Sequence, residues 1–291
     1  MTSDTVPSAA PGAMERRPRR QSIYRHSLVV RATHWINLVC MTVLLMSGLQ
    51  IFNAHPALYW GDRSSFEKPL LEMGARRDGA GHEIGVTTIL GHEIDTTGVL
   101  GLSRDESGDL AARGFPSWAT LPGPQWLAMG RRWHFFFAWV FVINGLVYAV
   151  YSIAARHLTR DLVPSGRDLA HIPRSIWDHL RFRFPEGEAA RRYNVLQKLA
   201  YLIVAFGLGP LIVLAGLTMS PTLDAGFPWL LAFFDGRQSA RTIHFLCAFA
   251  FLAFVLIHVF MVLVSGVWNN LRSMISGRYV IDAAGGDDGR H

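Results

Sequence analysis

Charged residues are scarce in this sequence, making up 17% of its 291 residues, whereas hydrophobic residues make up 50%. The scarcity is uneven, because four long stretches contain no Asp, Glu, Lys or Arg. A helix needs about 20 apolar residues to cross a bilayer, and each stretch is long enough. The sequence therefore predicts an all-α membrane protein, a bundle of four spanning helices at about residues 33–52, 133–155, 199–220 and 242–268.

Cysteine is nearly absent, and neither Cys40 nor Cys247 belongs to a CxxC or CxxCH motif. This pattern argues against a thiolate-bound iron–sulfur cluster in the chain and against a covalently attached c-type haem. Carboxylates are missing from all four predicted spans. Their absence excludes the Glu-based di-iron site of helix bundles and disfavours a proton relay, which normally uses Asp or Glu inside the membrane.

Basic residues exceed acidic ones and give a formal net charge of +6. The arginines cluster beside the apolar stretches, which is a signal of membrane topology and not of nucleic-acid binding. The N-terminal tail and the 156–198 loop are rich in arginine, whereas the long 53–132 loop mixes eight basic with ten acidic residues. We therefore expect cytoplasmic N- and C-termini, a cytoplasmic 156–198 loop and a periplasmic 53–132 loop in a multi-pass protein of the bacterial inner membrane.

The chain divides into three expected regions. Residues 1–22 are rich in Pro, Ala and Arg and are expected to form a disordered N-terminal tail. Residues 23–276 are expected to form one four-helix membrane domain, and residues 277–291 a C-terminal tail.

The connecting segments carry weaker patterns. The long loop repeats GHEI at residues 81–84 and 91–94 around VTTIL, which predicts a β-hairpin or meander. The basic, amphipathic residues 168–184 are typical of a helix resting on the cytoplasmic leaflet. Residues 227–234 are too short to span and are expected at the outer interface, and Pro210 is expected to kink the third span.

The fourth span contains two histidines, His244 and His258, which lie fourteen residues apart. In an α-helix this spacing returns the side chain to within about 40° of its starting direction and advances it about 21 Å. One helix face therefore presents an imidazole near each membrane surface. His34 at the inner end of the first span and His134 at the outer end of the second lie at matching depths. We expect His134 to pair with His244, and His34 with His258.

Paired imidazoles from facing helices are typical axial ligands of haem iron in helix bundles. Zinc takes three or four protein ligands in most sites, and each pair offers two. The sequence thus favours two b-type haems, one in each leaflet. Small residues in the spans offer space for a macrocycle edge or a close helix contact: Gly48, Gly145, Gly207, Gly209, Ala215 and Gly216.

Alternatives remain open for single residues. A lone histidine at a membrane interface, such as His134 or His244, is most often an ordinary amphipathic side chain. His26 is a rival ligand for the inner site and His55 for the outer site. A haem-free membrane anchor or transporter is the corresponding alternative function.

The spans also resemble a known family. RATHWINLVCMTVLLMSGLQI and the His–x13–His spacing resemble the first and fourth spans of the bacterial dihaem cytochrome b family. That family includes the membrane subunits of formate dehydrogenase, nickel–iron hydrogenase and thiosulfate reductase, and is related to cytochrome b561. RRWHFFFAWVFVINGLVYAVY, RYNVLQKLAY and PLIVLAGLTMSP look most like the thiosulfate-reductase-type branch. The resemblance covers roughly residues 24–276, and the long 53–132 loop is a departure from the smaller stand-alone members.

This resemblance implies two haem b groups with the same pairing that depth suggests. His34 and His258 would ligate the haem on the cytoplasmic side, and His134 and His244 the haem on the periplasmic side. The protein would supply ligation and electrostatics, while the cofactor carries the redox chemistry.

The resemblance also implies exchange with a quinone beside the start of the third span, where Asn194, Gln197 and Lys198 are the candidate contacts. Polar residues at a helix entrance are more often membrane anchors. The implied function is an electron-transfer subunit that links the quinone pool to a periplasmic molybdopterin oxidoreductase docked on the long loop. A stand-alone cytochrome b561-type oxidoreductase, for example one acting between superoxide and quinone, is the competing function.

Overall fold

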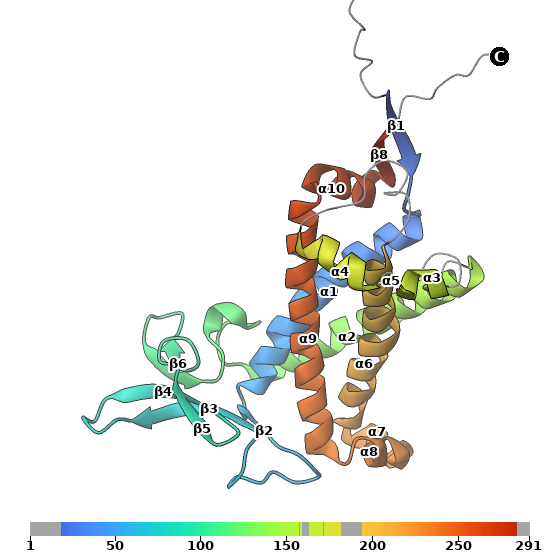
Figure 1. Ribbon diagram of the computed structural model, residues 1–291. Coiled ribbons are helices and arrows are strands. Elements are labelled where there is room, and N and C mark those ends of the chain that lie inside the picture. Colours follow the sequence, from blue (N-terminus) through green and yellow to red (C-terminus); the bar gives the residue numbers. More distant parts are fainter. Residues whose placement is uncertain (1–18, 157, 159–162, 171, 182–193, 284–291) are drawn as a thin grey trace, which may run out of the picture.

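The computed structural model describes residues 19–156, 158, 163–170, 172–181 and 194–283. Within them, four helical spans are long and apolar enough to cross a membrane, as the sequence predicted (Figure 1). They are α1 (Leu28–Phe52), α2 (Leu127–Ala154), the composite span Val195–Thr218 and α9 (Arg237–Val264). Helix α1 packs along α2, and the composite span packs along α9.

Each helix begins four to six residues before the expected span. The difference arises because hydropathy locates only the apolar residues and leaves out the polar ones at the start of each helix. α1, for example, begins at Leu28 after the N-cap Ser27, whose side chain accepts a hydrogen bond from the backbone N–H of Val30 at 3.3 Å. Charged side chains at a helix end do not interrupt its hydrogen bonds and can extend towards water. The helices therefore continue beyond the apolar membrane core.

The composite third span consists of α5 (Val195–Leu202), the π-helix η4 (Ile203–Leu208) and α6 (Gly209–Thr218). Pro210 lies in the first turn of α6 and has no N–H to donate. The turn before it widens, and the N–H of Gly209 donates to the carbonyl of Val204. The disturbance expected at Pro210 therefore takes the form of a π-turn, which is a recognised cause of helix kinks.

The segment between α1 and α2 is built from strands. β2 (Ala57–Leu58), β3 (Leu71–Arg77), β4 (Glu83–Ile89) and β5 (His92–Asp95) form one antiparallel sheet in that order. β6 (Gly101–Arg104) and β7 (Leu110–Arg113) form a second, and the 3-10 helix η1 (Ser117–Ala119) follows. We call residues 57–119 the β unit. The GHEI repeats correspond to the β4–β5 hairpin, as predicted. The prediction of an all-α protein is corrected by the β unit as a whole, and it holds for the membrane helices alone.

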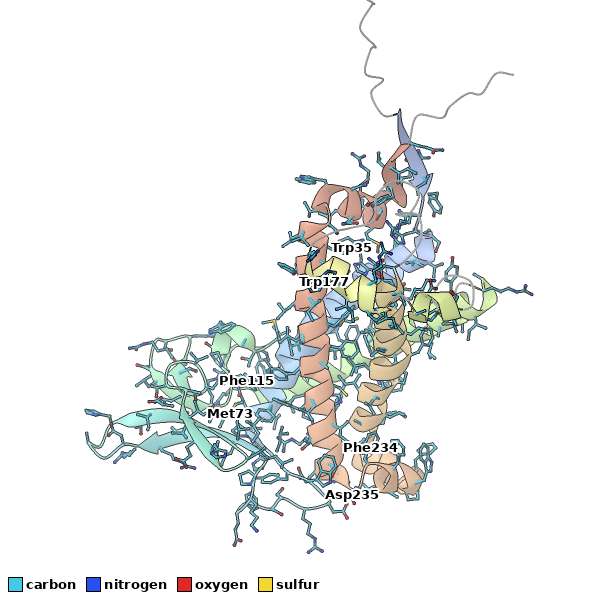
Figure 2. All side chains as sticks on the ribbon, viewed as in Figure 1. Trp35, Met73, Phe115, Trp177, Phe234 and Asp235 are labelled. Carbon is cyan, nitrogen blue, oxygen red and sulfur yellow. The ribbon has the colours of Figure 1, made fainter. Side chains whose placement is uncertain are left out.

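An apolar cluster joins the β unit to the helices. Leu49 and Phe52 of α1 pack with Leu58, Met73 and Phe115 of the β unit. Phe52 and Phe115 also contact Phe245 of α9, at ring-centroid distances of 4.9 and 6.4 Å. Met73 and Phe115 lie where the β unit meets the helices (Figure 2). The β unit is therefore packed against the bundle and is not a free loop.

The opposite end of the bundle carries both ends of the described chain. Helix α9 ends at Val264, and Gly266, which has φ +104°, lies between it and α10 (Val267–Ser276). β1 (Arg19–Tyr24) pairs antiparallel with β8 (Arg278–Ala283) at the end away from the β unit (Figure 1). Residues 19–22 and 278–283 were expected in the two tails, and the pairing of these segments corrects that expectation. Residues 1–18 and 284–291 lie outside the described residues.

Short helices flank the third span. α3 (Gly166–Ala170) and α4 (Ile172–Leu180) precede it. The amphipathic helix predicted over residues 168–184 overlaps the end of α3 and all of α4, and its residues 171 and 182–184 lie outside the described residues. α7 (Pro221–Gly226) and α8 (Pro228–Phe233) follow it at the β-unit end (Figure 1). Leu230 and Phe234 pack there on Ala215 of α6 and Ala240 of α9. These contacts fix the turn between the third and fourth spans.

Candidate functional site

Helix α9 contributes one histidine to each of two imidazole pairs. His134 of α2 faces His244 with ring centroids 6.1 Å apart and ring planes at 62°. His34 of α1 faces His258 with ring centroids 6.1 Å apart and ring planes at 65°. We call His134 and His244 the outer pair, because both lie towards the β-unit end, and His34 and His258 the inner pair. The structure thus brings together the residues that the sequence paired by depth.

The outer pair has hydrogen-bond partners on two other helices. Nδ1 of His134 lies 3.1 Å from the Ser47 hydroxyl of α1, and Nδ1 of His244 lies 2.8 Å from the carbonyl oxygen of Ile212 in α6. Because a carbonyl oxygen only accepts, the His244 bond assigns the proton to Nδ1. The Nδ1 side of each ring is therefore engaged by a neighbouring helix, and Nε2 of His244 keeps its lone pair for a metal.

Two glycines make this close approach possible. A Cβ added to Gly48 would lie 3.3 Å from Cε1 of His134, and one added to Gly216 would lie 3.2 Å from Cε1 of His244. Even an alanine at either position would require the imidazole to shift by a few tenths of an ångström. Of the six small residues singled out from the sequence, these two contact the outer pair.

The inner pair has a different environment. The ring of His34 lies edge-on to Trp35 at 5.4 Å, and the ring of His258 stacks on Phe254 at 5.9 Å and 19°. Beside His34, the side-chain amide of Asn144 donates to the Thr33 carbonyl at 2.9 Å and to the Asn37 side chain at 2.7 Å. This buried contact ties α2 to the helical turn of α1 that carries His34.

The pairs fit a haem better than a metal held by protein alone. Among the described residues, no group of three or more His, Cys, Asp or Glu could hold a metal ion. Two imidazoles that share one metal about 2 Å from each nitrogen have ring centroids roughly 6 Å apart, and both pairs have a centroid distance of 6.1 Å. Each pair could therefore supply the two axial ligands of a macrocycle that brings four donors of its own.

Of the two rival histidines, His55 lies in an aromatic group at the β-unit end. Its ring stacks on Tyr59 at 5.6 Å and 24° and meets Phe66 edge-on at 6.0 Å. Burial, and then the nearby Arg241 guanidinium, lower the pKa of His55, so its imidazole is neutral near pH 7. His26 lies at the β1–α1 junction, where its backbone N–H donates to the Gly277 carbonyl at 3.4 Å.

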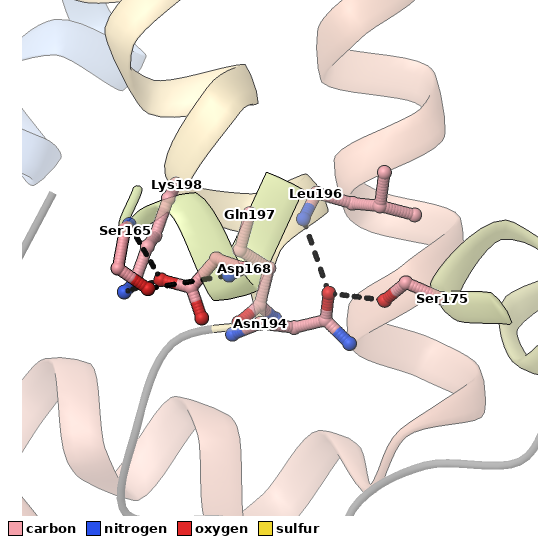
Figure 3. Close-up of polar contacts among 7 residues, drawn as sticks. All are labelled: Ser165, Asp168, Ser175, Asn194, Leu196, Gln197 and Lys198. Carbon is pink, nitrogen blue, oxygen red and sulfur yellow. Dashed lines mark hydrogen bonds and ion pairs between the residues drawn. The ribbon is translucent and has the colours of Figure 1, made fainter. Parts of the chain in front are cut away.

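The three quinone candidates organise the start of the third span (Figure 3). Asn194 caps α5, and its side-chain oxygen accepts from the N–H of Leu196 at 3.0 Å and from the Ser175 hydroxyl at 2.6 Å. Gln197 closes the capping box by accepting from the Asn194 backbone N–H at 3.2 Å. Lys198 forms an ion pair with Asp168 at 2.9 Å. All three therefore have a structural task at this helix start.

Sequence reasoning did not single out Ser47, Asn37 or Asn144. Each is a polar residue inside an apolar span, and in a membrane such residues mark interior contacts. That signal would have indicated that each of them contacts another polar group inside the bundle. It could not have named their partners, because the partners depend on how the helices are rotated against each other.

Comparisons with known proteins identify the family of this chain. A family model described as prokaryotic cytochrome b561 matches residues 25–277, which include all four spans and all four paired histidines. The putative protein-methionine-sulfoxide reductase subunit YedZ1 of Azospira oryzae is 27% identical over 252 residues, which cover 87% of this chain and 96% of the relative. No solved structure matches the chain. The chain belongs to the prokaryotic cytochrome b561 family, whose members are haem-b-binding electron-transfer proteins that pass several times through the bacterial inner membrane.

Proposed function

We propose that this chain is a dihaem b-type cytochrome that carries electrons across the membrane between the quinone pool and a periplasmic redox partner. One observation carries the proposal: α9 presents two imidazoles, and a second imidazole from another helix faces each of them at 6.1 Å. A haem held by each pair would supply a one-electron carrier. The chain's own residues would hold its iron and set its potential.

The spacing of the pairs suits transfer across a bilayer. His244 and His258 are separated along α9 by about 21 Å of helix rise, and the hydrocarbon core is about 30 Å thick. One pair therefore lies near each surface, and α9 serves both. The third span contributes no histidine, and its backbone supports His244 through the Ile212 carbonyl.

We propose an orientation with both termini in the cytoplasm and the β unit in the periplasm. The arginine-rich segments favour this orientation by the positive-inside rule. The pairing of β1 with β8 supports it as well, because the two ends of the chain then share the side of the bundle opposite the β unit (Figure 1).

The partner would be a periplasmic oxidoreductase of the molybdopterin class. The relative from Azospira oryzae is named as a subunit of a protein-methionine-sulfoxide reductase, which favours a subunit role here too. The β unit would form the docking surface. It is packed on α1 and α9 through Phe52, Phe115 and Phe245, so a partner bound there would sit close to the outer pair.

On the cytoplasmic side, quinone exchange is proposed beside the start of the third span. Asn194 and Gln197 use their side-chain oxygens within the capping box, and their amide N–H groups are the atoms of the right kind to donate to a quinone carbonyl. Lys198 would have to exchange its ion pair with Asp168 for such a contact.

Proteoliposomes test the direction and the sidedness together. A quinol in the membrane should reduce haem b, and electrons should then reach a membrane-impermeant acceptor present on the β-unit side. Orientation is read by labelling Ser107→Cys, in the exposed β6–β7 turn, with an impermeant thiol reagent; the native Cys40 and Cys247 are buried. Haem reduction without delivery to the acceptor on the labelled side would contradict the proposal.

A further inference from the structure

The Ser47 hydroxyl lies between its own helix and the His134 ring. Ser47 is fully buried, and its Oγ lies 2.6 Å from the Val43 carbonyl oxygen and 3.1 Å from Nδ1 of His134. A hydroxyl has one hydrogen to donate, and the shorter bond to Val43 takes it. Ser47 Oγ is therefore left as an acceptor, and Nδ1 of His134 must be the donor.

This bond fixes the tautomer of His134. With the proton on Nδ1, Nε2 carries the lone pair that a metal requires. The neighbouring Gly48 keeps the ring in place, because its Cα lies so close that an added Cβ would be 3.3 Å from Cε1. Ser47 and Gly48 thus set the proton position and the orientation of the same imidazole.

The two members of the outer pair differ in one useful respect. His244 donates to a backbone carbonyl, that of Ile212, which no substitution removes. His134 lies 3.1 Å from a side-chain acceptor, the Ser47 hydroxyl, and also has the Leu44 backbone carbonyl within hydrogen-bonding reach; of these two acceptors only Ser47 can be removed by substitution. In the inner pair, within the residues that the structure describes, neither His34 nor His258 has a hydrogen bond at a ring nitrogen. Ser47 is therefore the side chain through which a substitution can change the ligand strength of the outer pair alone.

We infer that Ser47 is a positioning residue that sets the redox potential of the outer haem, an inference that rests on the function proposed above. A metal-bound imidazole that donates its second N–H is a more basic ligand. A more basic ligand stabilises the ferric ion and lowers the reduction potential. Loss of the Ser47 acceptor therefore raises the potential of the outer haem and leaves the inner haem unchanged.

The test is a redox titration of purified, haem-loaded Ser47→Ala. One of the two haem components should titrate at a higher potential, and His258→Ala, which leaves the outer pair intact, identifies that component. A hydrogen bond between neutral groups corresponds to a factor of up to about ten in equilibrium, and a tenfold shift equals about 59 mV for one electron. The Leu44 backbone carbonyl is a second acceptor for the His134 ring and remains in Ser47→Ala, so the shift should not exceed this range.

Further variants separate positioning from general damage. Ser47→Thr keeps the hydroxyl and should restore the wild-type potential, and Ser47→Cys, a weaker acceptor, should shift it partway even if the alanine variant does not fold. Thr42→Val is the matched control, because the Thr42 hydroxyl bonds to the Leu38 carbonyl at 2.9 Å on the same helix, like Ser47, but does not bond to a histidine.

The outcomes distinguish this inference from the proposed function. If the wild type holds two haems and both potentials stay unchanged in Ser47→Ala or Ser47→Cys, the role of Ser47 is overturned and the dihaem proposal stands. If the wild type holds fewer than two haems, the proposed function itself fails. A shift in both components, or in Thr42→Val, also overturns the inference.

Discussion

Glycines at two positions let the outer imidazoles rest on helix backbones. Gly48 and Gly216 occupy equivalent places beside His134 and His244, with an added Cβ 3.3 and 3.2 Å from the respective Cε1 atoms. A contact this short requires the ring to move by a few tenths of an ångström. The ring cannot move freely, because its Nδ1 is hydrogen-bonded on the same side.

Gly216→Ala should therefore weaken the outer haem. The added methyl group pushes His244 away from the Ile212 carbonyl, and loss of such a supporting contact typically lowers metal affinity by about 10- to 100-fold. Haem content per chain should fall from two towards one on dilution or dialysis.

Gly145→Ala is the control for that substitution, since an added Cβ there meets no atom within 4 Å. It should keep both haems and stabilise α2 by up to about 1 kcal/mol. Equal haem content in the two variants would show that Gly216 does not support His244.

For single residues, the sequence predicted which histidines pair but not which residues hydrogen-bond to them. The pairs follow from helix periodicity, because fourteen residues restore one face, and from depth along each span. Ser47 of α1 meets His134 of α2, and Ile212 of α6 meets His244 of α9. Both contacts depend on how these helices are rotated and spaced, which cannot be read from a single sequence. The quinone contacts remain predictions. The structure gives Asn194 and Gln197 a role in capping α5 and does not test whether they also bind a quinone.

Among the elements, the start of the third span has an ion pair in addition to its capping box. Lys198 of α5 meets Asp168 of α3, whose side chain is 35% exposed. The Ser165 backbone N–H, and then Lys198, lower the pKa of Asp168. A carboxyl of this kind stabilises the fold at pH values above its ordinary pKa of about 4, and the contribution is lost as the pH falls through the lowered pKa.

Lys198→Met should lower the free energy of unfolding by less than about 1 kcal/mol, because water screens a partly exposed ion pair. Hydrogen exchange of α3 and α5 near pH 7 should rise modestly in the variant, and the difference from wild type should shrink as the pH falls below 4. The exposed Lys68→Met is the control and should change neither helix. If the quinol-oxidation rate falls by much more than the folded fraction of the protein does, Lys198 is instead assigned to the quinone.

For the helices, the positions of the spans could be predicted from the sequence, but the residues at which the helices begin could not. Apolar length located all four spans, but hydrogen bonding continues past the first charged residue, so α9 begins at Arg237 and not near residue 242. The π-turn before Pro210 could be anticipated as a disturbance. Its type could not, because it depends on which carbonyl the Gly209 N–H reaches.

For the whole molecule, the β unit is the main departure from the sequence expectation. The GHEI repeats indicated the β4–β5 hairpin, which local turn chemistry specifies. The pairing of β2 with β3 and the packing of Phe115 on Phe52 join residues far apart in the chain. Local patterns do not carry such contacts, and the same holds for the β1–β8 pairing of the two chain ends.

The central claim is that each histidine pair holds one haem, and haem content per purified chain tests it most directly. The wild type should contain two haems b. His134→Ala and His258→Ala should each retain one, with different optical spectra, because each variant loses one member of a different pair. His55→Ala should keep both, since its ring stacks on Tyr59. Two haems retained in His134→Ala or in His258→Ala would contradict the account.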